Sequence, residues 1–357
     1  MLFIADQASR GEGLKIFLDD FGIFLGRKRN RFVVKSRGEA KEIVADEVDS
    51  IICLSSGVSF SASALDLAVQ KNIQVILAHH SGWPYAILMP ASITGSVRAR
   101  REQFKAYNDE RGFALAKGFV SGKLLNQSNI LKLMAKNRRQ TDPRLAEELY
   151  ESGILIEDLR RGVEELEAPN VDEGRQPLMN LEAEGARAYW GCLRMVLPQE
   201  LGFEGRETRG ARDPFNAMLN LGYQAALFPE VWKAVTYTGL DPYAGYLHAD
   251  RPGKPSLVLD IMEEFRQQVV DRTLIGLLTK GTIRAGDLMA EDDAEGGRKL
   301  KREVVRELLK SFQERLEAEA IFKGEKSTIR GFIHIQARRV IRYLLEGEGY
   351  TPFHLGW

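Results

Sequence analysis

The chain has 357 residues, 44% hydrophobic and 28% charged, and its 50 Lys and Arg balance its 50 Asp and Glu. This length suggests about two domains, and zero net charge neither supports nor excludes a nucleic-acid partner. The N-terminus lacks a signal-peptide pattern, and no run of about 18 apolar residues indicates a membrane span. Two cysteines suggest no disulfide framework. We therefore expect a cytoplasmic protein without a membrane partner.

Short strands are predicted from the N-terminus to about residue 90. They are rich in β-branched or aromatic residues and separated by turn residues: LKIFLDD, GIFLGRK, RFVVKS, SIICLSS, IQVILAHH and YAILMPA. One helix is predicted over 61–71, where serines precede apolar residues at helical spacing. This pattern is typical of a small β-sandwich or a curled sheet, so we assign residues 1–92 to a β-rich N-terminal domain.

After Pro90 the hydrophobic periodicity becomes helical. Helices are predicted over 96–118, 123–137, 144–166, 178–196, 214–232, 256–278, 299–320 and 328–345. The predicted fold class is therefore α+β, with a small N-terminal β-sandwich domain followed by a larger all-α domain over residues 93–357.

Charge is segregated within the helical part. Residues 97–139 carry 11 Lys and Arg against 3 Asp and Glu, residues 142–174 carry 3 against 11, and residues 298–342 carry 13 against 6. Two basic segments allow a neutral chain to present a phosphate-binding face. Solvated helix faces that neutralise one another are the alternative interpretation.

The stretch GYLHADRPGKPSLVLDIMEEFR indicates a possible metal site. A turn at RPGKP precedes a helix on which Asp260 and Glu263 share a face, and His248 lies across the turn. A histidine with carboxylates suits a hard divalent cation and tolerates manganese. Alternatively, Asp260 is a surface acid paired with Arg266, and His248 is a loop histidine with satisfied hydrogen bonds.

Two further helices carry polar residues beside apolar faces. In LMNLEAEGARAYW, Glu182 lies next to the apolar side of a helix with small residues, and Glu184 is its solvated neighbour. In DPFNAMLNLGYQAALF, Asp213 is predicted as the N-cap, and Asn216 and Asn220 lie one turn apart. Paired asparagines on one face would satisfy buried backbone groups or orient a carboxylate. Ser256 is similarly predicted to cap the helix that contains Asp260.

Four blocks in order, EA–small–AYW, DPxNAxLNxGY, GLDPYxGxLH and LxxDxMEEFR, resemble the CRISPR-associated spacer-acquisition integrase family. Its members are metal-dependent DNA endonucleases found with nearly all CRISPR loci. The resemblance extends over essentially the whole chain, including the closing segment TIRGFIHIQARRVIRYL. It implies a β-rich N-terminal domain followed by a helical catalytic domain.

The resemblance also implies the site residues. Glu182, His248 and Glu263 match the metal ligands, and Asp260 matches a supporting catalytic acid. A shift along the helix would select Glu184 in place of Glu182. The expected cofactor is Mn²⁺ or Mg²⁺, and one imidazole among oxygen ligands favours Mn²⁺.

Other positions follow from the same comparison or from the basic segments. Asn216 and Asn220 match an asparagine pair that supports the active site. Glu264 stands where many members carry proline, so we do not expect it to be a ligand. Lys254, in the turn near His248, is a candidate phosphate contact. Further candidates for DNA binding are Arg138, Arg139, Lys280, Arg330, Arg338, Arg339 and Arg342.

The family reaction transfers the 3′-hydroxyl ends of a foreign DNA fragment, the protospacer, onto phosphodiesters of the CRISPR repeat array, and the same site can hydrolyse DNA. The resemblance further implies a homodimer formed through the N-terminal domain and a small ferredoxin-like CRISPR adaptation protein as partner. The alternatives are a metal-dependent nuclease acting on branched DNA in repair, and a non-catalytic DNA-binding structural subunit. A small-molecule metallohydrolase is disfavoured because the sequence lacks the paired histidines of such sites.

Overall fold

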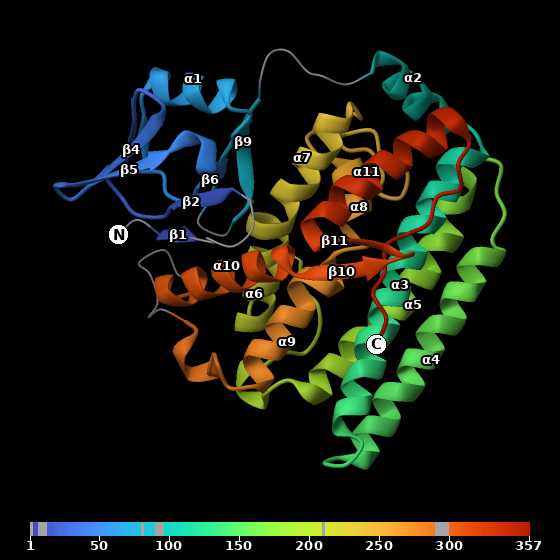
Figure 1. Cartoon of the computed structure of the whole chain (residues 1–357). Coiled ribbons are helices and arrows are strands. Elements are labelled where there is room, and N and C mark those ends of the chain that lie inside the picture. Colours follow the sequence, from blue (N-terminus) through green and yellow to red (C-terminus); the bar gives the residue numbers. More distant parts are fainter. Residues whose placement is uncertain (1–2, 6–12, 80–81, 90–95, 209–210, 290–299) are drawn as a thin grey trace.

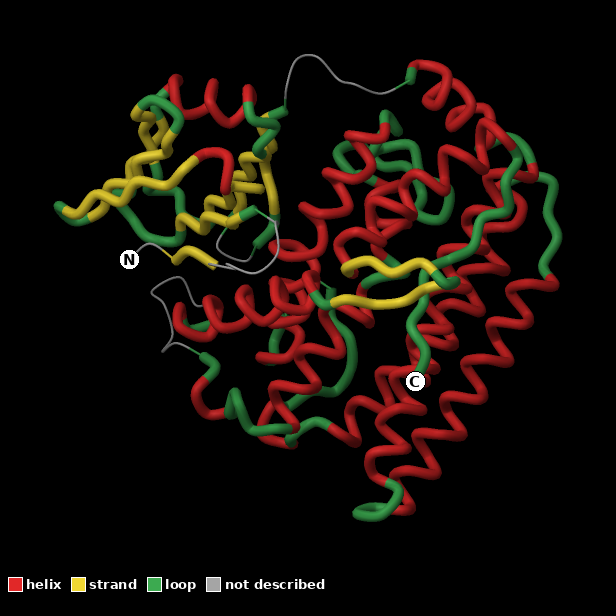
Figure 2. Tube along the Cα trace, viewed as in Figure 1, coloured by secondary structure: helices red, strands yellow, loops and turns green. Residues whose placement is uncertain are grey.

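A computed structural model describes residues 3–5, 13–79, 82–89, 96–208, 211–289 and 300–357. The N-terminal strands form one lobe and most of the helices form a second, larger lobe (Figures 1 and 2). The predicted boundary at residues 92/93 falls in 90–95, outside the described residues. Among the described helices, none combines the length and apolar character that a membrane crossing needs.

The N-terminal lobe contains two sheets. The five-stranded sheet has the order β1 (Phe3–Ala5), β2 (Leu14–Leu18), β6 (Val48–Cys53), β8 (Gln74–Ala78) and β9 (Pro84–Leu88). The four-stranded sheet has the order β5 (Glu39–Val44), β4 (Arg31–Ser36), β3 (Phe24–Lys28) and β7 (Ser59–Phe60). Helix α1 (Ala62–Gln70) begins after Ser61, whose side chain accepts a hydrogen bond from the Ala64 amide. The predicted β-sandwich is confirmed, although the sequence did not indicate β1, β5 or β7.

Alternation along the central strands divides the apolar residues between two cores. Ile16 and Leu18 of β2 pack into the core of the N-terminal lobe, whereas Phe17 joins the core of the helical lobe. Successive strand residues point to opposite faces, so the five-stranded sheet is buried on both sides. The sheet therefore packs directly against the helical lobe.

Buried and half-buried ion pairs reinforce this contact. Lys15 of β2 pairs with Glu230, and Lys233 pairs with Asp49 at 2.5 Å. Glu230 also pairs with Arg330 at 3.1 Å. Because buried charges are costly unless paired, these contacts favour one arrangement of the two lobes.

Three long helices lie side by side in the helical lobe: α3 (Glu110–Arg138), α4 (Pro143–Glu165) and α5 (Val171–Val196) (Figure 1). The predicted helices over 96–118 and 123–137 were misplaced. Helix α2 (Val97–Ala106) ends early, and Asp109 caps the continuous helix α3 by accepting from the Arg111 amide. Gly185 of α5 allows close packing, since a Cβ there would lie 2.3 Å from Leu124 of α3.

The remaining helices are α6 (Pro214–Leu221), α7 (Phe228–Thr238), α8 (Ser256–Met262), α9 (Arg272–Thr279), α10 (Arg302–Glu317) and α11 (Ile329–Glu346). The predicted helices over 214–232 and 256–278 are not regular. Wider π-helical turns interrupt them at Gly222–Leu227 and Gln267–Asp271. Asp213 caps α6 as expected, with Pro214 in the first turn.

The second domain is mostly helical, as predicted, and it also contains a short hairpin. A hairpin of β10 (Glu319–Phe322) and β11 (Glu325–Thr328) separates α10 from α11. Its turn places Lys323 and Gly324 at φ of 53° and 79°. Adjacent residues in this left-handed region match the twist of a two-residue hairpin, and Lys-Gly is a weaker sequence signal for it than Asn-Gly.

Candidate active site

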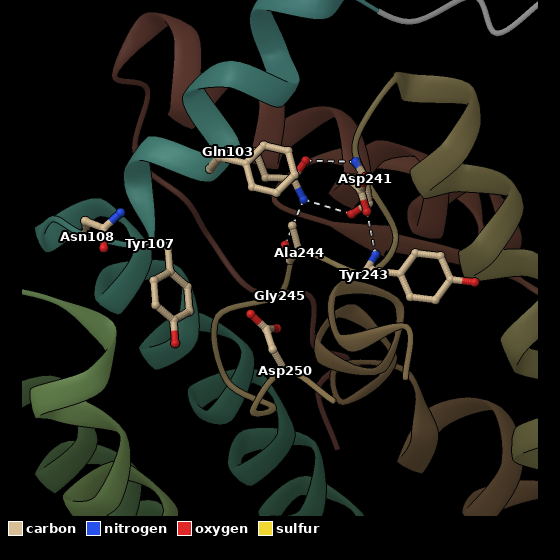
Figure 3. A pocket seen from close by; sticks show the side chains of 9 residues that line it. Gln103, Tyr107, Asn108, Asp241, Tyr243, Ala244, Gly245 and Asp250 are labelled. Atoms are coloured by element: carbon tan, nitrogen blue, oxygen red, sulfur yellow. Dashed lines mark hydrogen bonds between the residues drawn. The ribbon is translucent and has the colours of Figure 1, made fainter. Parts of the chain in front are cut away.

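The loop between α7 and α8 carries His248, and Gln103 of α2 holds this loop in place. The buried Gln103 amide donates to the carbonyls of Asp241 (2.9 Å) and Ala244 (2.8 Å), and its oxygen accepts from the Asp241 amide (2.8 Å) (Figure 3). Beside these contacts, α2 and the loop line a hollow of about 540 Å³, bordered by Tyr107 and Tyr243. Helix α2 therefore fixes the approach of the loop to the site.

Asp260 of α8 holds the other end of the loop. Its fully buried carboxylate accepts hydrogen bonds from the backbone amides of Tyr246, Leu247 and His248 at 2.6 to 3.0 Å. Gly245 permits this close approach, because a Cβ there would lie 2.7 Å from the Asp260 carboxylate. The loop is thus wrapped around one carboxylate.

Asp260 also orients the imidazole of His248. Nδ1 of His248 lies 2.7 Å from Oδ1 of Asp260. Because a carboxylate can only accept, the Nδ1–H of His248 donates to Asp260, and Nε2 is the ring nitrogen that remains available to a ligand. Nε2 faces Glu263, at 3.9 Å from Oε1. Metal-binding histidines usually have this arrangement, with a carboxylate on the ring nitrogen that does not bind the metal.

Two glutamates meet at one lysine ammonium beside His248. Nζ of Lys123, from α3, lies 2.7 Å from Glu263 and also pairs with Glu182 of α5. Arg266 pairs with the second oxygen of Glu263 at 3.2 Å. Burial disfavours the charged form of Glu263, but Arg266 and Lys123 outweigh this effect and lower its pKa to about 2. Glu263 is therefore an ionised, buried carboxylate at neutral pH.

The structure brings Glu182, His248, Asp260 and Glu263 into one region, whereas Glu184 is exposed. The alternative of a surface Asp260 paired with Arg266 is wrong, because Asp260 is fully buried and bonded to the loop amides, and Arg266 pairs with Glu263. Ser256 is not an N-cap: it is the first residue of α8, and its hydroxyl accepts from the Gly245 amide and donates to the Tyr243 carbonyl. Ser256 therefore fixes the histidine loop.

Asn216 and Asn220 act through an arginine. Their side-chain oxygens accept from Arg206 at 2.9 and 2.7 Å. The Arg206 guanidinium lies 5.4 Å from the ring centre of Tyr223, and that of Arg266 lies 4.9 Å from the same ring. The asparagine pair therefore positions Arg206, which shares the Tyr223 ring with Arg266, the partner of Glu263.

Glu264 points away from the site and fastens the C-terminal segment. Its buried carboxylate accepts from Gln336 (2.6 Å), from the Phe353 amide (2.6 Å) and from the Tyr350 hydroxyl. Burial raises its pKa to about 7 despite these donors. Glu264 thus anchors residues 350–353, and its carboxylate is engaged by these three donors.

The candidate DNA-binding residues differ in their surroundings. Lys280 and Arg338 are exposed, and Lys254 is half-buried in the turn near His248. Arg339 lies over Phe322 and contacts Gln336 and Glu325, and Arg330 pairs with Glu230 and Glu317 in the interior. These two arginines therefore have structural partners that leave little of their charge for a phosphate.

Sequence reasoning missed Lys123, Gln103 and Arg206. Lys123 and Gln103 reach the glutamates and the histidine loop from helices distant in sequence, and Arg206 contacts Asn216 and Asn220 from the loop before α6. Nothing in the local pattern marks these three residues. Arg266 is the exception, because its spacing of three residues from Glu263 on a helix predicts an ion pair. The alternative interpretation of the sequence pairs Arg266 with Asp260, whereas the structure pairs Arg266 with Glu263.

Asp271 is another buried carboxylate, and its hydrogen-bond partners are two tyrosines. It accepts hydrogen bonds from Tyr189 of α5 at 3.0 Å and from Tyr223. Burial raises the pKa of Asp271 from 3.8 to about 6, although the two tyrosine hydroxyls oppose this change. This bond network connects the two π-helical turns to α5.

We expect Asp271→Asn to change how stability depends on pH. In the wild type, the folded state binds more protons than the unfolded state between pH 3.8 and about 6. The unfolding free energy therefore falls as pH rises through this window, by about 3 kcal/mol at most. The variant lacks this contribution. The amount by which its unfolding free energy falls below that of the wild type should therefore be smaller at pH 7.5 than at pH 4. Urea denaturation at both pH values measures the difference, and a deficit independent of pH would contradict it.

The donor chemistry fits a divalent cation, since two carboxylates share one positive charge and an oriented imidazole faces one of them. Within the described residues, however, no group of three or more His, Cys, Asp or Glu side chains is close enough to hold a metal ion. Lys123 lies between Glu182 and Glu263. Binding of a metal therefore requires a rearrangement of these side chains.

Comparisons with known proteins agree with this architecture. The family model for CRISPR associated protein Cas1 matches residues 16–314. A CRISPR-associated endonuclease Cas1 from Archaeoglobus fulgidus is 34% identical over 354 residues, covering 96% of this chain and 100% of the relative. A casposase bound to integration product has a TM-score of 0.79 at 23% identity, covering 94% of this chain and 92% of its own. A Cas6-RT-Cas1–Cas2 complex has a TM-score of 0.78 at 20% identity, covering 96% of this chain and 36% of its own.

Proposed function

Since the chain belongs to the family of CRISPR associated protein Cas1, we propose that it is a divalent-metal-dependent DNA endonuclease and integrase of CRISPR adaptation. It joins 3′-hydroxyl ends of foreign DNA fragments to the CRISPR repeat array by transesterification. The observation that carries this proposal is the meeting of Glu182 and Glu263 at one positive charge, beside a histidine oriented by Asp260.

The proposed reaction exchanges one phosphodiester for another. The attacking 3′-oxygen forms a bond to phosphorus, and the bond from that phosphorus to the 3′-oxygen of the repeat strand breaks. A bound Mn²⁺ or Mg²⁺ would neutralise the non-bridging oxygens and activate the attacking hydroxyl. Glu182, Glu263 and Nε2 of His248 would hold the ion. Asp260 keeps the imidazole oriented, and Arg266 balances the charge of Glu263.

We further propose that the chain forms a homodimer through its N-terminal lobe and acts in the cytoplasm with a small ferredoxin-like CRISPR adaptation protein. The Cas1–Cas2 complex among the structural neighbours supports such a second protein. For DNA, the exposed side chains of Lys280 and Arg338 and the half-buried Lys254 are the preferred phosphate contacts.

Strand joining tests this function directly. Duplexes with free 3′-hydroxyls are incubated with a plasmid that carries repeats, in Mn²⁺, Mg²⁺ or EDTA. We expect joining by the wild type in metal, no joining in EDTA, loss in Glu182→Ala, and retention in the exposed neighbour Glu184→Ala. The reverse result for the two glutamates would reassign the ligand. Metal-independent joining would contradict the proposal, and cleavage of branched DNA without joining would favour a repair nuclease.

A further inference from the structure

Lys123 occupies an unusual place in the proposed metal site. It extends from α3 to carboxylates of two other segments, Glu182 on α5 and Glu263 directly after α8. Its side chain is 13% exposed and that of Glu263 is 4% exposed. Burial disfavours the ammonium, yet Glu263 and Glu182 together raise the pKa of Lys123. A single ammonium thus joins the two carboxylates.

A divalent ion ligated by the two oxygens that now contact Nζ, Oε1 of Glu182 and Oε2 of Glu263, would lie where the ammonium now lies. Metal–oxygen distances of about 2.1 Å leave no room for an ammonium between the oxygens. The two cations would also repel each other strongly at such a short separation in a partly buried site. The two glutamates therefore cannot hold both cations in the present arrangement.

We propose that Lys123 is a built-in competitor of the metal ion, which holds Glu182 and Glu263 together in the metal-free protein and is displaced when the metal binds. This inference rests on the proposed function, because it takes the two glutamates as metal ligands. It gives the site two alternative cations, one supplied by the protein and one by the solvent. The apparent affinity of the site for Mn²⁺ is then lower, because the metal ion must displace the ammonium of Lys123.

Mn²⁺ binding to the full-length protein, measured from the electron paramagnetic resonance signal of free Mn²⁺, tests this inference without an activity assay. The variants are Lys123→Met and Lys123→Gln, which remove the charge, and Lys123→Arg, which keeps it. Lys132→Met is the matched control, since Lys132 is another buried lysine of α3 and pairs with Glu157 away from the site. His248→Ala reports whether Mn²⁺ binds at the proposed site.

We expect both uncharged variants to bind Mn²⁺ at least about tenfold more tightly than wild type, because they lack the positive charge of Lys123 that repels the metal ion. Lys123→Arg and Lys132→Met should not bind more tightly. If Lys123→Met is unstable without metal, Mn²⁺ should raise its Tm by more than it raises that of the wild type. Unchanged or weaker affinity in both uncharged variants, with binding still lost in His248→Ala, would overturn the inference and leave the metal site standing. Absence of His248-dependent binding in every variant would overturn both.

Discussion

His248→Ala is expected to lower the rate of strand joining more than about 100-fold while the protein remains folded and bound to DNA. Loss of a residue that only orients a metal ligand typically costs about 10- to 100-fold, and His248 is assigned as a ligand itself. The fold should persist because the backbone amide of His248, which the substitution retains, makes its structural bond to Asp260. The ring adds the contact of Nδ1 with Asp260 and the longer approach of Nε2 to Glu263 at 3.9 Å.

Three measurements separate the possible outcomes for His248→Ala. Joining assays give the rate, fluorescence anisotropy gives DNA affinity, and circular dichroism melting gives Tm. His79→Ala serves as the control, because His79 is an exposed histidine that follows strand β8 of the N-terminal lobe. Joining at the wild-type rate would remove His248 from the site, and loss of DNA affinity would assign the ring to binding instead.

Asp260→Ala is expected to lower the unfolding free energy by about 4 kcal/mol. The substitution removes the acceptor of three backbone amides at Tyr246, Leu247 and His248, and each unpaired buried donor costs about 1–3 kcal/mol. Asp260→Asn keeps one oxygen acceptor but turns an amide group toward the remaining donors. We expect it to be destabilised by a smaller amount than the alanine variant.

Urea denaturation of both Asp260 variants provides the test. Asp250→Ala is the matched control in the same loop, since Asp250 is exposed and contacts the Ser256 hydroxyl at 3.2 Å. It should lose less than about 1 kcal/mol. A loss in Asp260→Ala no greater than that of Asp250→Ala would show that the loop is held by Gln103 and Ser256 without the carboxylate.

The spacing of apolar residues predicted the element types well, because burying one face of a strand or a helix requires apolar residues at the repeat of that element. Runs with alternating residues became the strands of the sandwich, and the long helical patterns became α3, α4, α5 and α11. Element ends were less predictable. Asp109 caps a helix inside a segment that is predicted to be helical throughout, and a hairpin with its turn at Lys323 and Gly324 separates the last two long helices.

At the candidate site, the sequence likewise indicated the residues but not the role of each. The sequence motifs indicated Glu182, His248, Asp260 and Glu263, and their order along the chain supported the family resemblance. The roles of these residues required the structure. Asp260 is shown to hold the histidine loop, and Glu264, adjacent to a proposed ligand, is shown to anchor the C-terminal segment.

The sequence by itself determined the type of most elements, the α+β class and the family, and it indicated the carboxylates and the histidine of the candidate site. These properties depend on local spacing along one strand or helix and on motif order. Only the tertiary structure decided that Lys123 lies between Glu182 and Glu263, and that Gln103 holds the loop of His248. Residues 123 and 263 lie on different helical segments, and their contact depends on how α3 packs against the rest of the lobe. Such packing is set by the combined shape of many side chains, so no local pattern encodes it.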